Sequence, residues 1–100
     1  WVFHLNRAST VVLAEKLSMG GVSGTTVDLR LLYKSALERL TSSIILAHNH
    51  PSDQMRPSKS DVDLTKQVVA AGKIFDIDVV DHLIIGSSTF YSFADDGKLN

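Results

Sequence analysis

The chain opens with two short stretches in which apolar and β-branched residues predominate, a composition typical of β-strands. These stretches are Val2 to Leu5 and Val11 to Leu17, and the turn-prone segment Asn6 to Ser9 lies between them. Two apolar stretches joined by a short polar turn are characteristic of a hairpin. We therefore expect a strand over each stretch and the pairing of the two as a β-hairpin.

The apolar positions that follow repeat with the period of an α-helix. Their spacing is i, i+3, i+4, i+7 and i+11, and they are Leu29, Leu32, Tyr33, Ala36 and Leu40. Asp28 precedes them, at the position where a short polar side chain caps the first backbone N–H groups. An amphipathic helix is expected after Asp28. The segment before it, Gly20 to Thr26, contains three glycines and is expected to be a loop.

A continuous apolar run, Ile44 to Ala47, then predicts a strand that is buried on both faces, with His48 and His50 at its end. After a polar turn region over 51–57, the helical period returns from Ser58, and Gly72 marks the expected end of this helix. Two further strands are expected at Ile77 to Ile85 and at Thr89 to Phe93.

The expected order of elements is therefore ββαβαββ. Helices placed among strands in this way predict an α/β fold, with a mixed β-sheet flanked by two main helices. One hundred residues are the usual size of one domain, so we expect a single domain over residues 1–100. The first residue is Trp1 rather than Met, and we expect the chain to be part of a longer polypeptide.

Charge and cysteine content narrow the classes of function. The net charge is −1 and the ten Lys and Arg residues are scattered, so the charge pattern gives no support to DNA contact. The chain has no cysteine, which leaves His, Asp and Glu as the strong metal ligands and fits a cytoplasmic location. No apolar run is long enough to cross a bilayer, so no membrane role is expected.

The two histidines at the end of the third predicted strand are candidates for metal ligands. Residues i and i+2 of a strand point to one face, so His48 and His50 direct two imidazoles the same way. Asp61 follows at the start of the second helix, where one helical turn can return a carboxylate to them. Two His and one carboxylate leave the fourth position of a tetrahedral zinc ion for water, as in catalytic zinc sites.

Structural interpretations of the same residues stay open at this point. A pair of histidines at a strand end is more often exposed or hydrogen-bonded than bound to a metal. Ser58 and Asp61 also have the spacing of a capping box, in which the serine caps the helix and the acidic side chain returns the bond.

The full pattern, His48-Asn49-His50, seven residues, then Ser58 and Asp61, resembles the H-x-H-x7-S-x2-D signature of JAB/MPN (JAMM) metalloproteins. The segment 46–52 is similar to the bacterial RadC branch of that family, as are Gly20-Gly21 and the segment 80–86. The resemblance implies the JAB/MPN fold, with its cytidine-deaminase-like architecture, and one Zn²⁺ on His48, His50 and Asp61. One departure is Asp53, which stands where the family pattern has glycine.

Members of this family known as enzymes hydrolyse peptide or isopeptide bonds with a water activated by the metal. The resemblance implies a general base on an earlier strand. Glu15 stands where the RadC pattern places an acidic residue, and no other carboxylate occurs before Asp28. The alternative for Glu15 is a solvent-facing strand residue. Ser58 would help to hold the oxyanion.

Three functions follow from the resemblance. The first is a zinc-dependent hydrolase acting on a peptide or a protein conjugate, in a family traditionally associated with DNA repair. The second is a non-catalytic JAB/MPN module that binds a protein partner, and the third a metal-dependent nuclease, for which the site offers few carboxylates. His82, in an apolar stretch, is interpreted as a hydrogen-bonded core residue and not as a ligand.

Overall fold

The computed structural model describes residues 1–17, 28–50 and 55–99. Its elements follow the predicted order ββαβαββ: β1 (Val2–Leu5), β2 (Val11–Glu15), α1 (Leu29–Glu38), β3 (Ser43–Asn49), α2 (Lys59–Phe75), β4 (Asp78–Ile85) and β5 (Phe90–Ser92). The glycine loop predicted over 20–26 and the departure at Asp53 lie outside the described residues. Neither described helix combines the length and the apolar character needed to cross a membrane.

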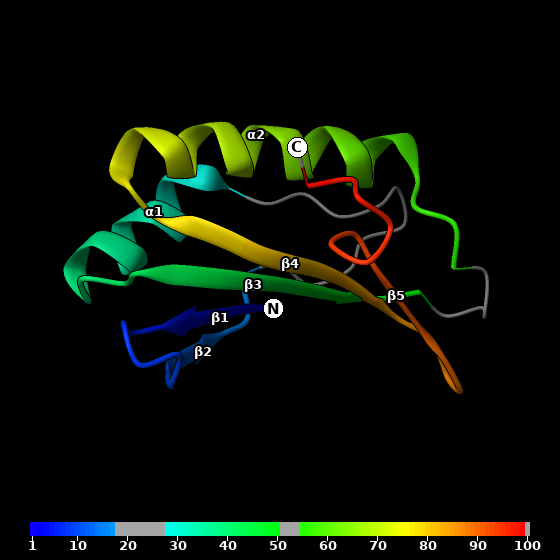
Figure 1. The fold of residues 1–100 in the computed structure, drawn as a ribbon, viewed down its shortest axis with the longest axis horizontal. Coiled ribbons are helices and arrows are strands. Elements are labelled where there is room, and N and C mark those ends of the chain that lie inside the picture. Colours follow the sequence, from blue (N-terminus) through cyan, green and yellow to red (C-terminus); the bar gives the residue numbers. More distant parts are fainter. Residues whose placement is uncertain (18–27, 51–54, 100) are drawn as a thin grey trace.

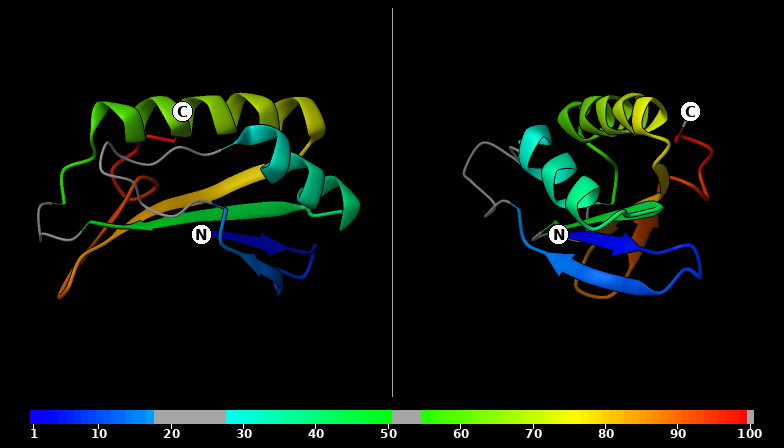
Figure 2. Two further views of the ribbon diagram at one scale, coloured as in Figure 1. Left: turned by 180° about the vertical axis from the view of Figure 1, so that it is seen from behind. Right: turned by 90° about the vertical axis from the view of Figure 1, so that its left-hand side faces the viewer.

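The strands form one mixed sheet in the order β2-β1-β3-β4-β5. β1 and β2 pair as the expected antiparallel hairpin, β1 also pairs antiparallel with β3, and β5 pairs antiparallel with β4. The central pair, β3 and β4, is parallel, with α2 as the crossover between them. Both helices lie over the same face of the sheet (Figures 1 and 2). The predicted fold class, a mixed sheet flanked by two helices, is confirmed.

The core lies between the helices and this face of the sheet. Its buried residues come from every layer: Val2, Leu32, Tyr33, Ala36, Ile44, Leu46, Val68 and Ile77. The α1 positions in this set belong to the predicted apolar face, and the Asp28 side chain caps α1 by accepting a hydrogen bond from the Arg30 N–H at 2.9 Å. Burial of this apolar face, more than helix propensity, stabilises a helix of ten residues.

The prediction that α2 ends at Gly72 is wrong, because the helix continues to Phe75 and its C-cap is Asp76 in the left-handed conformation, with φ of 58°. Gly72 serves a different purpose. A Cβ atom at this position would lie 2.3 Å from the backbone oxygen of Ile77, where the chain turns back toward the sheet. The absence of a side chain therefore allows a close approach, which a sequence pattern cannot distinguish from a helix end.

A β-bulge in β4 changes which residues of this strand face the helices. Ile44 pairs with Val79, but the next residue of β3, Ile45, pairs with Asp81, so Val80 is an additional residue. Bulges of this kind shift the alternation of side chains by one position. As a result His82 pairs with Leu46 on the helix-covered side of the sheet.

Candidate metal centre

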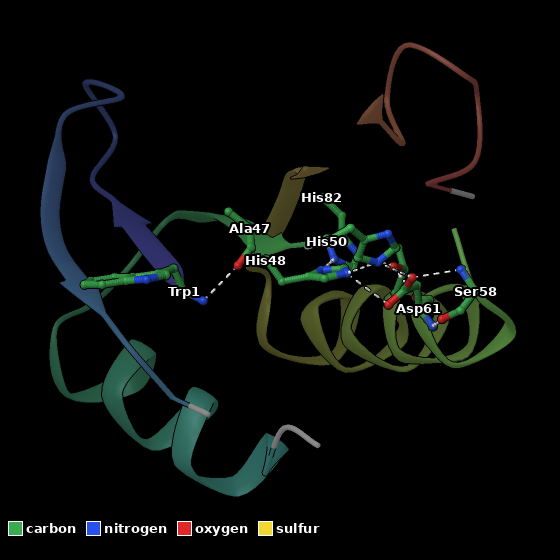
Figure 3. A network of polar contacts seen from close by, with 8 residues as sticks. Trp1, Ala47, His48, His50, Ser58, Asp61 and His82 are labelled. Atoms are coloured by element: carbon green, nitrogen blue, oxygen red, sulfur yellow. Dashed lines mark hydrogen bonds and ion pairs between the residues drawn. The ribbon is translucent and has the colours of Figure 1, made fainter. Parts of the chain in front are cut away.

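Two imidazoles meet at the carboxyl end of β3. His48 is near the end of the strand and His50 follows it directly, and their Nε2 atoms lie 3.0 Å apart. Their rings are half-buried and tilted by 56° to each other, with centroids 4.9 Å apart. The strand alternation that predicted a shared direction for these side chains therefore holds (Figure 3).

The Asp61 carboxylate, from the first turn of α2, faces both imidazoles. Its Oδ1 lies 3.1 Å from Nε2 of His48, and its Oδ2 lies 3.4 Å from Nε2 of His50. One donor atom from each of the three residues falls within 4.8 Å of the others, which suits three ligands around a single ion. Two imidazole nitrogens and a carboxylate oxygen are ligands of zinc and of other divalent transition metals.

The capping box is present as well. Ser58 Oγ accepts a hydrogen bond from the Asp61 N–H at 3.1 Å, and Asp61 Oδ2 accepts one from the Ser58 N–H at 2.8 Å. The structural interpretation of these two residues and the ligand interpretation are therefore compatible. The cap fixes the direction of the carboxylate that reaches the histidines.

Electrostatics favour an ionised Asp61 beside a neutral His48. Burial by itself raises the pKa of Asp61, but the hydrogen bonds from Ser58 and the nearby His48 and His50 outweigh it and hold this pKa below its ordinary value. Burial lowers the pKa of His48, against the opposing attraction of the Asp61 carboxylate. A carboxylate and a neutral imidazole are the protonation states that bind metals.

Behind His48 lies a third histidine that the sequence did not connect to the site. His82 Nε2 is 3.0 Å from Nδ1 of His48, and its own Nδ1 is 2.5 Å from the Thr65 hydroxyl oxygen. His82 is 1% exposed, and burial, followed by the charge of His48, lowers its pKa to about 4. The interpretation of His82 as a buried, hydrogen-bonded residue holds, but its partner is one of the candidate ligands.

Glu15 lies on the helix-covered side of the sheet, so the solvent-facing alternative is wrong. Val2 pairs with Glu15 on one side and with Leu46 on the other, which places these three in a row, and His48 lies two residues beyond Leu46. With strands about 4.8 Å apart and a rise of about 3.3 Å per residue, the Cα atoms of Glu15 and His48 are on the order of 12 Å apart.

The contacts of the Glu15 carboxylate are with α1 and β1. Its Oε2 accepts a hydrogen bond from Ser35 Oγ at 2.9 Å, and its Oε1 lies 3.7 Å from Nε2 of His4. His4 is fully buried, and its Nδ1 is 3.2 Å from Thr41 Oγ1. The geometry therefore joins His48, His50, Asp61 and Ser58 directly and leaves Glu15 in a neighbouring polar cluster.

Comparison with known proteins agrees with this geometry. A family model described as RadC-like JAB domain matches residues 1–98. The chain belongs to this family. It is 47% identical over 100 residues to a UPF0758 protein of Porphyromonas gingivalis, a match that covers 99% of this chain and 44% of that protein. A UPF0758 protein of Flavobacterium johnsoniae is 45% identical over 97 residues, which are 97% of this chain and 42% of the relative.

The RadC-like JAB domain described above therefore spans less than half the length of these relatives. Its membership confirms the resemblance drawn from the His-x-His, Ser58 and Asp61 pattern. Of the residues around the site, the sequence missed Thr65 and the role of His82 as a neighbour of His48. The signal for Thr65 is its position four residues after Asp61, one helical turn away on the same face.

Proposed function

We propose that this RadC-like JAB domain is a zinc-dependent hydrolase that cleaves an amide bond of a peptide or a protein conjugate. The observation that carries the proposal is the convergence of His48, His50 and Asp61 on one point. Three protein ligands leave a fourth position open, which distinguishes catalytic zinc sites from closed structural ones. A zinc ion bound here would polarise the scissile carbonyl and lower the pKa of a water molecule toward ~7.

Ser58 is proposed to stabilise the developing oxyanion. Its Oγ accepts a hydrogen bond from the Asp61 N–H, a bond that leaves the hydroxyl proton of Ser58 for donation. Because Ser58 is the N-cap of α2, its hydroxyl is held beside the Asp61 ligand and at the positive end of the helix dipole.

Glu15 is proposed as the general base that takes the proton of the attacking water and passes it to the leaving amine. The row of Glu15, Val2 and Leu46 puts it on the same face of the sheet as His48. Its carboxylate would have to turn from Ser35 toward the metal centre when substrate binds. Such a movement requires a change of the Glu15 side-chain rotamer.

A second candidate function rests on this same carboxylate. The contacts of Glu15 with Ser35 and His4 are those of a structural residue. A domain that holds a metal and keeps Glu15 in this cluster would be a non-catalytic module that binds a protein partner. A nuclease is the least supported alternative, because the metal centre of the described residues has one carboxylate. A cytoplasmic location stays a prediction from the composition.

Metal content and hydrolysis test the proposal together. We expect about one zinc ion per chain in the wild type by elemental analysis, none in His50→Ala, and an unchanged content in Asp63→Asn, a matched control at an exposed position of α2. Peptide and isopeptide substrates are then compared between wild type and Glu15→Gln. Cleavage that is lost in Glu15→Gln with zinc retained supports the hydrolase. Zinc binding without cleavage of any substrate supports the binding module, and absence of zinc from the wild type refutes both metal functions.

A further inference from the structure

We propose that His82 is a positioning residue, which holds His48 in the tautomer whose Nε2 carries no proton and faces Asp61. The argument follows a chain of hydrogen bonds from Thr65 through His82 to His48. The effect of this tautomer on metal binding rests on the proposed function. The positions of the protons along the hydrogen bonds do not depend on that function.

Thr65 determines which atoms donate and which accept along these hydrogen bonds. Its hydroxyl donates a hydrogen bond to the backbone carbonyl oxygen of Asp61 at 2.8 Å, the bond of a helix threonine to the residue four positions earlier. A hydroxyl has one proton, and the carbonyl takes it. In its contact with Nδ1 of His82, at 2.5 Å, Thr65 Oγ1 must therefore accept. The proton of this contact lies on Nδ1 of His82.

The next step follows from the chemistry of a neutral imidazole, which carries one proton on its two nitrogens. With Nδ1 of His82 protonated, its Nε2 is an acceptor, and the atom that faces it at 3.0 Å is Nδ1 of His48. His48 therefore donates from Nδ1, and its Nε2 is left with a lone pair. This Nε2 lies 3.1 Å from Asp61 Oδ1, at the point where the candidate ligands converge.

Packing holds the His82 ring in place. The ring stacks on Phe93, with centroids 4.6 Å apart and planes only 8° from parallel, and Phe93 is fully buried. The backbone N–H of His82 donates to Asp81 Oδ1 at 2.7 Å, and the Asp81 carboxylate also accepts hydrogen bonds from Ser92 Oγ and from the Ala94 N–H. Ligating histidines commonly donate their second ring N–H to a fixed acceptor, usually a carboxylate, a backbone carbonyl or water. In this domain the acceptor is Nε2 of His82.

The hydrogen bonds also form a chain that links α2 to β3. They start at the backbone of Asp61, pass through Thr65 and His82, and end at His48, whose other nitrogen faces the carboxylate of Asp61. Two candidate ligands from different elements, β3 and α2, are thereby tied together before any metal binds.

The first experiment reads the tautomer directly. Long-range ¹H–¹⁵N correlation spectra of the ¹⁵N-labelled protein, recorded without metal and after addition of zinc, should show the proton of His82 on Nδ1 in both states. Thr65→Val removes the acceptor at nearly constant volume and should move this proton to Nε2. Thr65→Ser keeps the hydroxyl and should restore the Nδ1 proton. A proton on His82 Nε2 in the wild type overturns the proposal.

The second experiment measures zinc affinity by competition with a chromophoric chelator. Thr65→Val and His82→Leu should weaken zinc binding by roughly 10- to 100-fold, the usual effect of losing a residue that orients a ligand. Thr65→Ser and His82→Gln, whose amide offers one acceptor and one donor, should regain most of the affinity. Circular dichroism checks that each variant is folded. Wild-type affinity in both Thr65→Val and His82→Leu overturns the proposal.

The experiments distinguish a failure of the proposed metal function from a failure of the proposed role of His82. If the wild type takes up no zinc while His82 is protonated on Nδ1, the metal function fails and the positioning of His48 stands. If zinc binds tightly while His82 is protonated on Nε2, the positioning fails and the metal function stands.

Discussion

The Asp61 carboxylate accepts a hydrogen bond from the Ser58 backbone N–H at 2.8 Å and, with the same group, faces the two imidazoles of the candidate metal centre. One side chain thus completes the cap of α2 and presents a metal ligand. The N-terminus of a helix stabilises a carboxylate through its partly positive N–H groups. The cap at the start of α2 therefore also orients the Asp61 carboxylate toward the two imidazoles.

Replacement of Asp61 by asparagine separates these two roles. The amide oxygen of Asp61→Asn can still accept from the Ser58 N–H, so we expect the free energy of unfolding in chelator to fall by no more than about 1 kcal/mol. Loss of the charged ligand should weaken zinc binding by more than roughly 100-fold, beyond the effect of residues that only orient ligands. Isothermal titration calorimetry with zinc, with Asp63→Asn as the control, measures the difference. Equal affinities in the two variants would contradict the role of Asp61 as a ligand.

Ser58→Ala tests the cap. Loss of the hydroxyl removes the acceptor of the Asp61 N–H, and we expect the free energy of unfolding to fall by about 1 kcal/mol, as for other N-cap replacements. Ser58→Thr keeps the acceptor and should stay close to the wild type. Urea denaturation in the presence of chelator measures both. Under the proposed function, Ser58→Ala should also retain zinc while hydrolysis slows by roughly 100-fold. An unchanged stability would mean that the cap contributes nothing.

Gly72→Ala should destabilise the protein, whereas the same substitution in a helix interior usually stabilises it. In a helix interior, alanine is ordinarily more stable than glycine by about 1 kcal/mol. Here the new Cβ would lie 2.3 Å from the Ile77 backbone oxygen and 3.3 Å from Tyr33 Oη, so we expect destabilisation by about 2 kcal/mol. Lys73→Ala, at the exposed neighbouring position, is the control and should change little. Thermal denaturation compares them, and a more stable Gly72→Ala would refute the close approach.

The buried His82 predicts how stability depends on pH. Burial, followed by the charge of His48, lowers the pKa of His82 from its ordinary value of 6.5 to about 4 in the folded protein. Between these two pKa values the unfolded chain binds more protons than the folded protein. The contribution of His82 to stability is therefore fully present above pH 6.5 and is lost as the pH falls toward 4. The loss from this residue is about 3 kcal/mol. Urea denaturation of metal-free protein from pH 4 to 7 should show a steeper decline in the wild type than in His82→Gln. Parallel profiles for the two proteins would contradict the assignment.

The order of the elements was readable from the sequence because each has a strong local pattern. The apolar positions from Leu29 to Ala36 predicted α1, and the strand bounds of β1 were reproduced without change. The last predicted apolar position, Leu40, was wrong, because it lies beyond the end of α1 and is exposed. The end of α2 was not readable. Gly72 has the residue type of a helix terminus, but a contact with Ile77 from the next segment decides its role.

The sequence by itself determined the candidate ligands, since the spacing of His48 and His50 along a strand, and of Ser58 and Asp61 along a helix start, fixes their directions locally. The sequence did not determine which residues hold these ligands in position. Strand alternation from Ile77 places His82 on the face opposite to the helices, and only the bulge at Val80 turns it toward His48.

The surroundings of Glu15 were likewise decided by tertiary structure, because Ser35 and His4 reach its carboxylate from α1 and β1. Contacts between elements depend on strand register and on how the helices pack over the sheet, and neither is encoded in the period of one segment. The sequence therefore determined which residues can bind a metal. The tertiary structure decided which side chains hold those residues in position.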